Sequence, residues 1–425
     1  MTDISPRFSL LFADPKGTKE EFYPPETMDF IGDLPCEDSA LMREILSRKT
    51  TRKDIAFRKE ILEDFLQSPT LLTKTEGVLQ RWEGLYETAR RESLPTADMP
   101  WEQGLEVLKD NALSLMEHLR FLRRAHDEMA DQTPDSEGMF AFTEYLRRHG
   151  NSEGVKTLTE QIAAYPLLRA EQTKVVLHLG LDRYGMKQKA LLTYLGTEDG
   201  KYLKKHPLRR EDFSVNLPKE NAPQLTAEAI GSLCRSFRTL TAGIRAAFVP
   251  LREGMVFYHF ALSITEWARS KGYAWRYASP VAEHGPAGRG IRNPAEPADG
   301  VYRPPLTCTA RPLEAYRGEW GTETLKILAR TQIFSTAGLP VVAEDLVFCP
   351  EERILVYDSA DKTVETEIEA LAALYRKTRR GDILLLNQPL ITVGNSPATE
   401  IIGNLLRAFH KKGAAVRLAT DLSVD

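Results

Sequence analysis

The hydrophobic and polar positions of residues 381–420 form two short apolar runs separated by a helical pattern. The first run, Ile383 to Leu386, follows Gly381 and Asp382 and is typical of a strand buried on both faces. The helical pattern has one apolar face, which consists of Ile401, Ile402, Leu405, Leu406 and Phe409. Gly413 ends this helix, and Ala414 to Ala419 makes a second apolar run. The segment therefore predicts a strand, a helix and a parallel strand.

Most of the chain before this segment has helical periodicity. Apolar residues recur at helical spacing between Ile55 and Leu66, from Glu102 to Met129, and from Thr226 to Trp267. Ser68 and Pro69 end the first of these patterns. We interpret the region as a helical lever or scaffold.

Three segments depart from the helical pattern. Val175 to Asp182 alternates like a strand and Ala190 to Leu195 is a second candidate, so a small β insertion is predicted near residues 174–215. Phe8 to Phe12 predicts one strand in an otherwise polar N-terminal arm. Glu283 to Pro305 is rich in Gly, Pro and Arg, which is typical of a linker between domains.

These patterns predict a mostly α-helical scaffold with a small β insertion, followed by an α/β domain. A chain of 425 residues favours two or three domains over a single core. We expect an N-terminal arm over residues 1–25, the helical domain over 26–280, a linker over 281–299 and the α/β domain over 300–425.

The first buried strand ends in two uncharged amide side chains, at positions where nucleotide hydrolysis requires carboxylates. In nucleotide-hydrolysing α/β domains an Asp at this place helps to hold Mg²⁺, and a Glu after it often activates water. The two positions here are Asn387 and Gln388. An amide oxygen cannot neutralise a hard cation, and Gln is no general base at physiological pH. The sequence thus predicts the shape of such a site without its charges.

Residues Thr324 to Asp421 resemble the ATPase domain of the MutS mismatch-repair family, in its short branch without a separate mismatch-reading domain. LKILARTQIFSTAGLPVVAEDLVF resembles the family's helix after the phosphate loop with the following turn and strand, and LLLNQP resembles its metal-binding strand end. LATDL resembles the switch that reads the γ-phosphate, with Asp421 in place of a His. Near the N-terminus, DFIGDLPCEDSALMREIL and DIAFRKEILEDFLQSP resemble the start of the short MutS-like proteins.

The resemblance implies a P-loop, ABC-type ATPase fold, but the motif that binds the phosphates is degenerate. A phosphate loop reads G-x-x-x-x-G-K-[ST], whereas the corresponding segment here reads EAYRGEWGTET, with no Lys before Thr322 or Thr324. We expect no hydrolysis, no ATP or ADP and no Mg²⁺. The remnants of the nucleotide site would be Gly318, Gly321, Thr322, Asn387, Gln388 and Asp421.

The resemblance also implies a dimer, because in this family each nucleotide is held between one subunit's phosphate loop and the other's signature segment. TVETEIEAL, at Thr363 to Leu371, resembles that signature segment. The expected interface residues are Thr363, Glu365, Glu367, Thr392 and Ser396. The partner would be a second copy of the chain or an active MutS-like ATPase.

The net charge and the distribution of basic residues bear on whether the chain binds DNA. The formal net charge is −4, so any affinity for double-stranded DNA has to come from a local patch. The densest basic cluster is KYLKKHPLRR, where the candidate phosphate contacts are Lys204, Lys205, Arg209 and Arg210. The ordinary interpretation of this cluster is a solvated hairpin or loop. If it binds DNA, we expect the binding to be non-specific.

The cysteines and the apolar segments indicate the compartment. Cys36, Cys234, Cys308 and Cys349 are far apart in the sequence and have no metal-ligand spacing, which is typical of reduced thiols in a cytoplasmic protein. No apolar run approaches the roughly 18 residues of a membrane span. Residues at the N-terminus lack a signal-peptide pattern.

The preferred hypothesis is a catalytically inactive MutS-like subunit, a pseudo-ATPase, that acts as a DNA-associated scaffold or partner of an active relative in DNA repair or recombination. One alternative is a regulator that binds nucleotide without hydrolysing it. Another is a protein-interaction module without DNA binding.

Overall fold

The computed structural model describes residues 8–14, 20–89, 92–96, 99–163, 174–181, 187–196, 222–281, 286–293, 305–309, 311, 313–318, 320–359, 364–389 and 397–420. The chain divides into two compact units. Unit 1 comprises Met1–Phe8, Ser68–Asp135 and Met139–Leu251, and unit 2 comprises Ser9–Gln67, Ser136–Gly138 and Arg252–Asp425. The described residues are mostly helical, with strands concentrated in the C-terminal part, as the sequence predicted.

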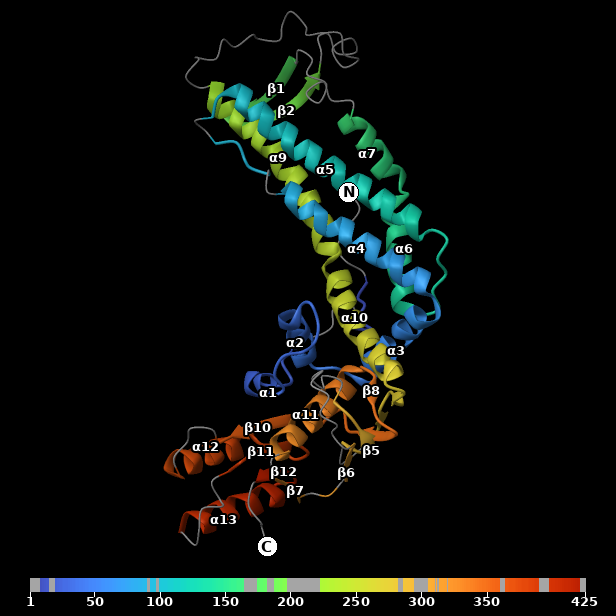
Figure 1. Cartoon of the computed structure of the whole chain (residues 1–425). Helices are drawn as coiled ribbons and strands as arrows, with labels where there is room; N and C mark the ends of the chain where they lie inside the picture. The colour runs from blue at the N-terminus through green and yellow to red at the C-terminus, as the bar shows by residue number, and fades with distance from the viewer. Residues whose placement is uncertain are drawn as a thin grey trace, which may run out of the picture. The chain divides into compact units, whose positions relative to one another are not determined.

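Unit 1 is built on a long helix. Its elements are α4 (Pro69–Ala89), α5 (Trp101–Met129), most of α6 (Glu137–Gly150), α7 (Glu153–Ala163), β1 (Lys174–Leu181), β2 (Lys187–Gly196) and α9 (Ala222–Ala247). Within this unit α5 lies along α9 and also contacts α4 (Figure 1). β1 and β2 pair antiparallel. The predictions of a long helix after residue 101 and of strands near residues 175 and 190 are confirmed.

Unit 2 contains a parallel sheet built from strand and helix in alternation. Its elements in chain order are β7 (Leu313–Arg317), α11 (Gly321–Ala337), β10 (Ile354–Asp358), α12 (Val364–Lys377), β11 (Ile383–Asn387), α13 (Pro397–Lys411) and β12 (Ala415–Thr420). The strands lie in the order β10, β11, β12, β7, and all neighbours are parallel. The last strand of this sheet in sequence, β12, is thus inserted between β11 and the first strand of the sheet, β7. The predicted strand, helix and parallel strand are present as β11, α13 and β12.

Helices cover both faces of this sheet. Leu384, Leu386, Val416 and Leu418 point to one face and form a core with Phe409 of α13 and Leu371 of α12. Since successive strand residues point to opposite faces, the intervening positions turn toward α11, which contacts β11, β12 and β7. All residues of β11 are buried, as expected for a central strand of a covered parallel sheet.

A second, mixed sheet occupies part of the expected linker. β4 (Ser279–Pro280), β9 (Asp345–Phe348), β5 (Ala287–Ile291) and β6 (Leu306–Cys308) lie side by side in this order, and β3 (Trp275–Arg276) pairs with β8 (Val341–Val342). The interpretation of residues 281–299 as a linker alone is therefore wrong for β5. A Cβ on Gly288 would lie 2.3 Å from the backbone oxygen of Asp345, so this glycine permits close strand pairing.

The N-terminal residues of unit 2 are packed rather than free. Residues 8–14 form no strand, in contrast to the prediction for Phe8 to Phe12. Leu10 and Leu11 are buried, and the Ser9 hydroxyl accepts hydrogen bonds from the backbone N–H groups of Leu11 and Phe12. A side-chain hydroxyl thus bonds backbone donors that a strand would have used in a ladder. The expected arm over residues 1–25 is therefore wrong for this buried part.

Several helices that we expected in the helical domain belong to unit 2 instead. They are α1 (Pro25–Phe30), α2 (Ser39–Ser47), α3 (Arg52–Gln67) and most of α10 (Val249–Ser270). Arg58 of α3 is fully buried and donates to the backbone oxygens of Leu11, at 2.6 Å, and Ala337, at 2.8 Å. The second oxygen lies at the C-terminal end of α11, so one buried guanidinium joins three segments. No described helix combines the length and the apolar character that a membrane crossing needs.

Candidate functional site

Five of the six residues that the sequence suggests as remnants of a nucleotide site lie where the parallel strands end: Gly318, Gly321, Thr322, Asn387 and Gln388. Cross-strand register places Asp358, Asn387 and Ala419 next to one another, with Tyr316 of β7 beyond Ala419. Three residues separate the end of β7 from the start of α11, so the first turn of α11 faces the same edge. Ligands of open α/β sheets commonly bind at this edge, outside the carboxyl ends of the strands.

A row of hydrogen bonds joins three of these residues. The Thr322 hydroxyl, in the first turn of α11, donates to Asn387 Oδ1 at 2.7 Å, and Asn387 Nδ2 donates to Asp358 Oδ1 at 3.2 Å. Asn387 is 7% exposed, so its amide is almost removed from water and both of its polar atoms are bonded within the chain. We name Thr322, Asn387 and Asp358 the polar row.

The connection between β7 and α11 is shorter than a phosphate loop. The motif spans eight residues from its first glycine to its Ser or Thr, whereas Gly318 to Thr322 spans five. Gly318 has φ +82°, and its backbone oxygen accepts from Gly321 N at 2.9 Å, which closes a tight turn. Arg317 precedes the turn, whereas the Lys of the motif follows the second glycine. The turn therefore provides neither the length nor the cation of a phosphate cradle.

Gly321 is enclosed by the ends of the neighbouring strands. A Cβ at this position would lie 3.1 Å from Ala419 Cβ and 3.1 Å from the Tyr316 backbone oxygen. Glycine is thus favoured here because the first turn of α11 approaches the sheet closely. This packing requirement explains the residue without any contact to a ligand.

Gln388 ends β11 in an unusual backbone conformation. Its φ of 44° is the one positive value of a non-glycine residue in the described part of the chain. The backbone N–H of Gln388 donates to the Ala419 oxygen at 3.0 Å, and its own oxygen accepts from the Ser359 hydroxyl. Such conformations are uncommon and persist where surrounding contacts fix them. The side chain of Gln388 is exposed.

The expected interface residues are only partly within the described structure. Glu367 of α12 is fully buried, and together with burial it raises the pKa of the neighbouring Tyr357 hydroxyl, with burial as the larger cause. A buried Glu367 packs within unit 2 and is not available to a partner surface in this conformation. Glu365 lies in the first turn of α12. Thr363, Thr392 and Ser396 lie outside the described residues.

Two further parts of the prediction also fall on residues that the structure does not describe. They are Asp421, at the switch, and the basic cluster of Lys204, Lys205, Arg209 and Arg210.

Sequence reasoning missed Asp358. The residue follows the apolar run ILVY, and its position at the end of β10 makes it the neighbour of Asn387. The available signal was the rule that polar residues after parallel strands meet at one edge of a sheet. The run is short and helical assignments compete for it, so the register with β11 could be known only from the structure.

A surface cavity of about 530 Å³ lies along the outer edge of β10, away from the polar row. Its lining includes Leu355 and Tyr357 of β10, Ala370 and Leu374 of α12, and Lys377. Neither Thr322 nor Asn387 contributes to it. Within the described residues, no group of three or more His, Cys, Asp or Glu side chains is arranged to hold a metal ion.

The four cysteines are unpaired, and Cys234, Cys308 and Cys349 are buried. Burial raises the pKa of each of these three thiols to about 11. At neutral pH they are protonated and poor nucleophiles.

No protein-family model matches the chain, and no curated protein matches its sequence.

Proposed function

We propose that the chain is a non-hydrolysing, MutS-like pseudo-ATPase that acts as a scaffold. The polar row carries this proposal. The residues that would hold Mg²⁺ in the family correspond to Thr322 and Asn387. Here Thr322 donates to Asn387, and Asn387 in turn donates to Asp358. Their polar atoms are satisfied without a metal or a nucleotide.

The domain assignment is supported by which strand ends meet. The segments that resemble the phosphate loop, the metal-binding strand end and the switch strand are far apart in sequence. Their counterparts are the start of α11, the end of β11 and the end of β12. These three adjoin at one edge of the sheet, where a nucleotide site of this family would require them to be.

The absence of turnover follows from chemistry. Transfer of a phosphoryl group needs charge stabilisation by a cation and a metal, together with a positioned water. Asn387 and Gln388 replace the two carboxylates, and the five-residue turn from Gly318 to Thr322 lacks the Lys. Each loss alone would slow an enzyme severely, and the losses act on the same transition state.

The proposed partners are a second copy of the chain or an active MutS-like ATPase, with non-specific contact to double-stranded DNA. A domain without hydrolysis can still present its surface, because its core needs only the strands and helices to pack. A homodimer would use the same patch twice around a two-fold axis. Light scattering on the chain alone and mixed with an active ATPase measures this, and a strict monomer in both samples would remove the dimer from the proposal.

The test of the pseudo-ATPase is phosphate release together with thermal stability in Mg·ATP. We expect no release above a protein-free blank and an unchanged melting temperature. A nucleotide present at about 100 times its Kd would add about 2.7 kcal/mol of stability. A melting shift without phosphate release would instead favour the nucleotide-binding regulator. Mg²⁺-dependent release that is lost in Gly321→Ala would contradict both.

A further inference from the structure

The amino-terminal end of the parallel sheet carries a dense group of cations. Residues 376–380, at the end of α12 and in the following turn, read RKTRR, and residues 407–412, at the end of α13, read RAFHKK. We name the following residues the basic surface: Arg376, Lys377, Arg379, Arg380, Arg407, Lys411 and Lys412. The two segments are separated by 26 residues of sequence, so only the fold brings them together.

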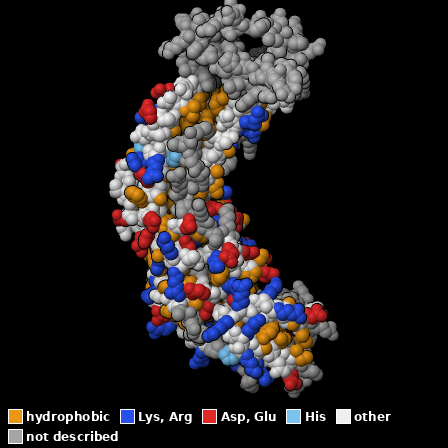
Figure 2. Space-filling model, turned by 180° about the vertical axis from the view of Figure 1, so that it is seen from behind, with side chains coloured by type: hydrophobic (Ala, Val, Ile, Leu, Met, Phe, Trp, Pro, Cys, Tyr) orange, Lys and Arg blue, Asp and Glu red, His pale blue; other side chains and the backbone are white. Residues whose placement is uncertain are grey.

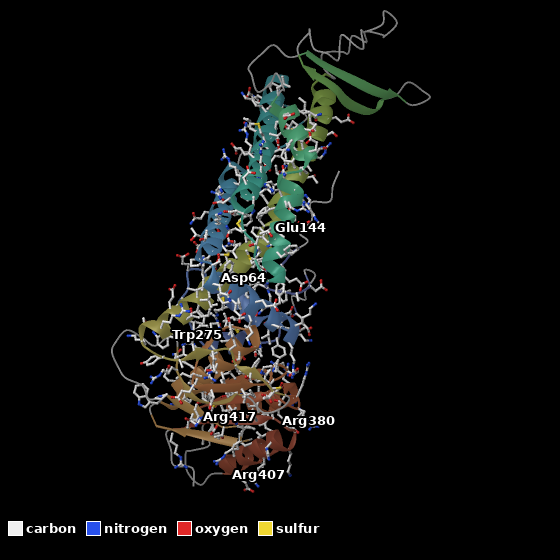
Figure 3. The ribbon with its side chains drawn as sticks, turned by 90° about the vertical axis from the view of Figure 1, so that its right-hand side faces the viewer. Asp64, Glu144, Trp275, Arg380, Arg407 and Arg417 are labelled. Atoms are coloured by element: carbon white, nitrogen blue, oxygen red, sulfur yellow. The ribbon has the colours of Figure 1, made fainter. Side chains whose placement is uncertain are left out.

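Backbone and side-chain contacts hold the two segments side by side. Gly381 N donates to the Gly413 oxygen at 2.9 Å, and Lys412 Nζ donates to the Tyr375 oxygen at 2.7 Å. A Cβ on Gly413 would lie 2.9 Å from Arg380 Cγ. Arg380 and Arg407 are labelled at this part of unit 2 (Figure 3). The basic surface is therefore continuous across both helix ends.

The cations of this surface are not paired within the described part of the chain, although Glu21 and Glu26 line one cavity together with Lys377 and Arg379. All its members are exposed except Lys412, which is half-buried. None of the seven forms an ion pair with a described carboxylate. The carboxylate nearest in sequence, Asp382, is 3% exposed and bonds the Arg353 guanidinium and Arg379 N. On unit 2 viewed from behind, Lys and Arg side chains (blue) lie interspersed with Asp and Glu side chains (red) (Figure 2).

Helix stability alone does not account for so many cations. A cation in the last turn of a helix interacts favourably with the helix dipole, by about 0.3–1 kcal/mol at low ionic strength, and the effect is confined to that turn. Arg376, Lys377 and Lys411 lie in the last turns of α12 and α13. Arg379 and Arg380 lie beyond α12, and Arg407 lies before the last turn of α13, so these three need another explanation.

A membrane surface is a poor match to this site. Binding of an amphipathic helix to a membrane interface is strengthened by apolar side chains that insert beside the cations. In the two basic segments the neighbouring apolar residues, Tyr375, Leu406 and Phe409, pack against the core between α12, α13 and the sheet. An extended polyanion requires only an exposed row of cations, which is what the two segments present.

We propose that the basic surface binds the phosphodiester backbone of a nucleic acid without reading its sequence. Long cationic side chains contact phosphates and position a protein, whereas sequence is read by groups that reach base edges. The inference deepens the proposed DNA-associated scaffold, because it assigns the contact to the pseudo-ATPase domain. The test of nucleic-acid binding does not depend on nucleotide hydrolysis. The proposed binding surface and the proposed absence of ATPase activity can therefore be contradicted separately.

The binding should depend steeply on salt. If four to six phosphates are neutralised, the slope of log K against log salt is about −4 to −5 for duplex DNA. The measurement is fluorescence anisotropy of a labelled duplex of about 20 base pairs, titrated with the full chain between about 50 and 200 mM salt. Duplex RNA and single-stranded DNA of equal length show which nucleic acid supplies the phosphates.

The decisive variant replaces Arg376, Arg379, Arg380 and Lys411 by Ala. These side chains are exposed and make no described ion pair, so the fold should persist, and circular dichroism checks it. We expect at least about a 100-fold weaker affinity near 100 mM salt and a slope reduced by about 3 to 4. The matched control removes four exposed cations elsewhere, Arg120, Arg123, Arg124 and Lys271, and should bind like the unmodified chain.

Two further experiments distinguish binding at the basic surface from binding at other cations of the chain. Replacement of Lys204, Lys205, Arg209 and Arg210 by Ala should leave a salt-dependent component of binding that the basic-surface variant has lost. Acetylation of lysines in the unmodified chain should show Lys377 and Lys411 protected by duplex DNA while Lys271 stays reactive, and this readout needs no variant.

The proposal is overturned if the basic-surface variant binds as tightly as the unmodified chain, or if the control variant loses as much affinity. It is also overturned if polyglutamate or vesicles rich in anionic lipid compete as well as unlabelled duplex, because the surface would then attract any anion.

Discussion

The two ends of one parallel sheet differ in how their polar groups are used. At the carboxyl ends of the strands, Thr322, Asn387 and Asp358 bond to one another. At the amino ends, six of the seven cations of the basic surface are exposed, and none of the seven makes a described ion pair. The same strands and helices hold both ends in place. The difference shows that one sheet can hold polar groups bonded to one another at one end and exposed, unpaired cations at the other.

The two ends of the sheet can differ in this way because the hydrophobic core of the sheet does not depend on the polar groups at its ends. Leu384, Leu386, Val416 and Leu418 pack with residues of α12 and α13 in the middle of the sheet. Neutral amides at Asn387 and Gln388 cost this core nothing, provided that their polar atoms are bonded. Exposed cations at helix ends likewise stay in water and need no burial.

The largest expected loss of stability comes from replacement of Arg417. This residue lies between the two ends of the parallel sheet and joins β12 to β7. It is buried, it donates to the Arg311 oxygen at 2.7 Å, and its Nε lies 3.5 Å from Glu314 Oε2. Arg417→Ala leaves Glu314 without its cation and should lower the free energy of unfolding by about 3 kcal/mol. Denaturant unfolding measures it. Arg407→Ala removes an exposed cation from the same domain and should cost less than about 0.5 kcal/mol.

Asn387→Asp should have the next largest effect. The substitution removes the Nδ2 donor and places a second carboxylate beside Asp358, so we expect a loss of about 1–3 kcal/mol near neutral pH. The paired carboxylates raise each other's pKa, and the loss should therefore shrink as the pH falls toward 5.

A swap of the two side chains tests this explanation. In Asp358→Asn with Asn387→Asp, the amide at 358 can donate to the carboxylate at 387, and most of the stability should return. If the double variant is no more stable than Asn387→Asp, the bond between these positions is not the cause of the loss.

A smaller, pH-dependent change in stability should arise from His118 in unit 1, which does not contain the parallel sheet. His118 is buried, its Nδ1 lies 2.7 Å from the Ser114 oxygen, and its Nε2 accepts from Arg245 Nε at 3.0 Å. Burial lowers the pKa of His118, and the Arg245 charge lowers it further, while the Ser114 bond and Glu92 oppose the shift. The folded state thus holds a neutral ring.

The sign of the expected pH effect follows from this lowered pKa. The unfolded chain binds the proton below about pH 6.5, whereas the folded chain resists it, so stability should fall on acidification by at most about 1.4 kcal/mol per pH unit. His118→Gln keeps an acceptor and should flatten this part of the pH profile. An identical profile in the variant would assign the loss to other groups.

The smallest expected effect is no change at all. Asn387→Asp combined with Gln388→Glu restores both carboxylates but neither the Lys nor the length of the phosphate loop, so ATP hydrolysis should stay at the blank. Phosphate release at saturating Mg·ATP measures it. Turnover in this variant would mean that the segment from Gly318 to Thr322 holds phosphates in a way that its length and composition do not indicate.

The sequence alone determined the elements whose signals are local. The strand from Ile383, the helix of α13 and the long helix α5 follow from the spacing of apolar residues, and the β1–β2 hairpin follows from alternation. Asn387 and Gln388 could be singled out because they follow a buried strand directly. In each case the residues that decide the structure are neighbours in the chain.

The tertiary structure decided whatever depends on distant segments. It placed residues 9–67 in unit 2 through contacts such as Arg58 with Ala337, and it drew β5 into a sheet because a glycine permits close pairing. It also made Asp358 the partner of Asn387 and joined the ends of α12 and α13 into one basic surface. Periodicity reports which side of an element is buried, but the identity of the element that buries it is a property of long-range packing, and no local pattern encodes it.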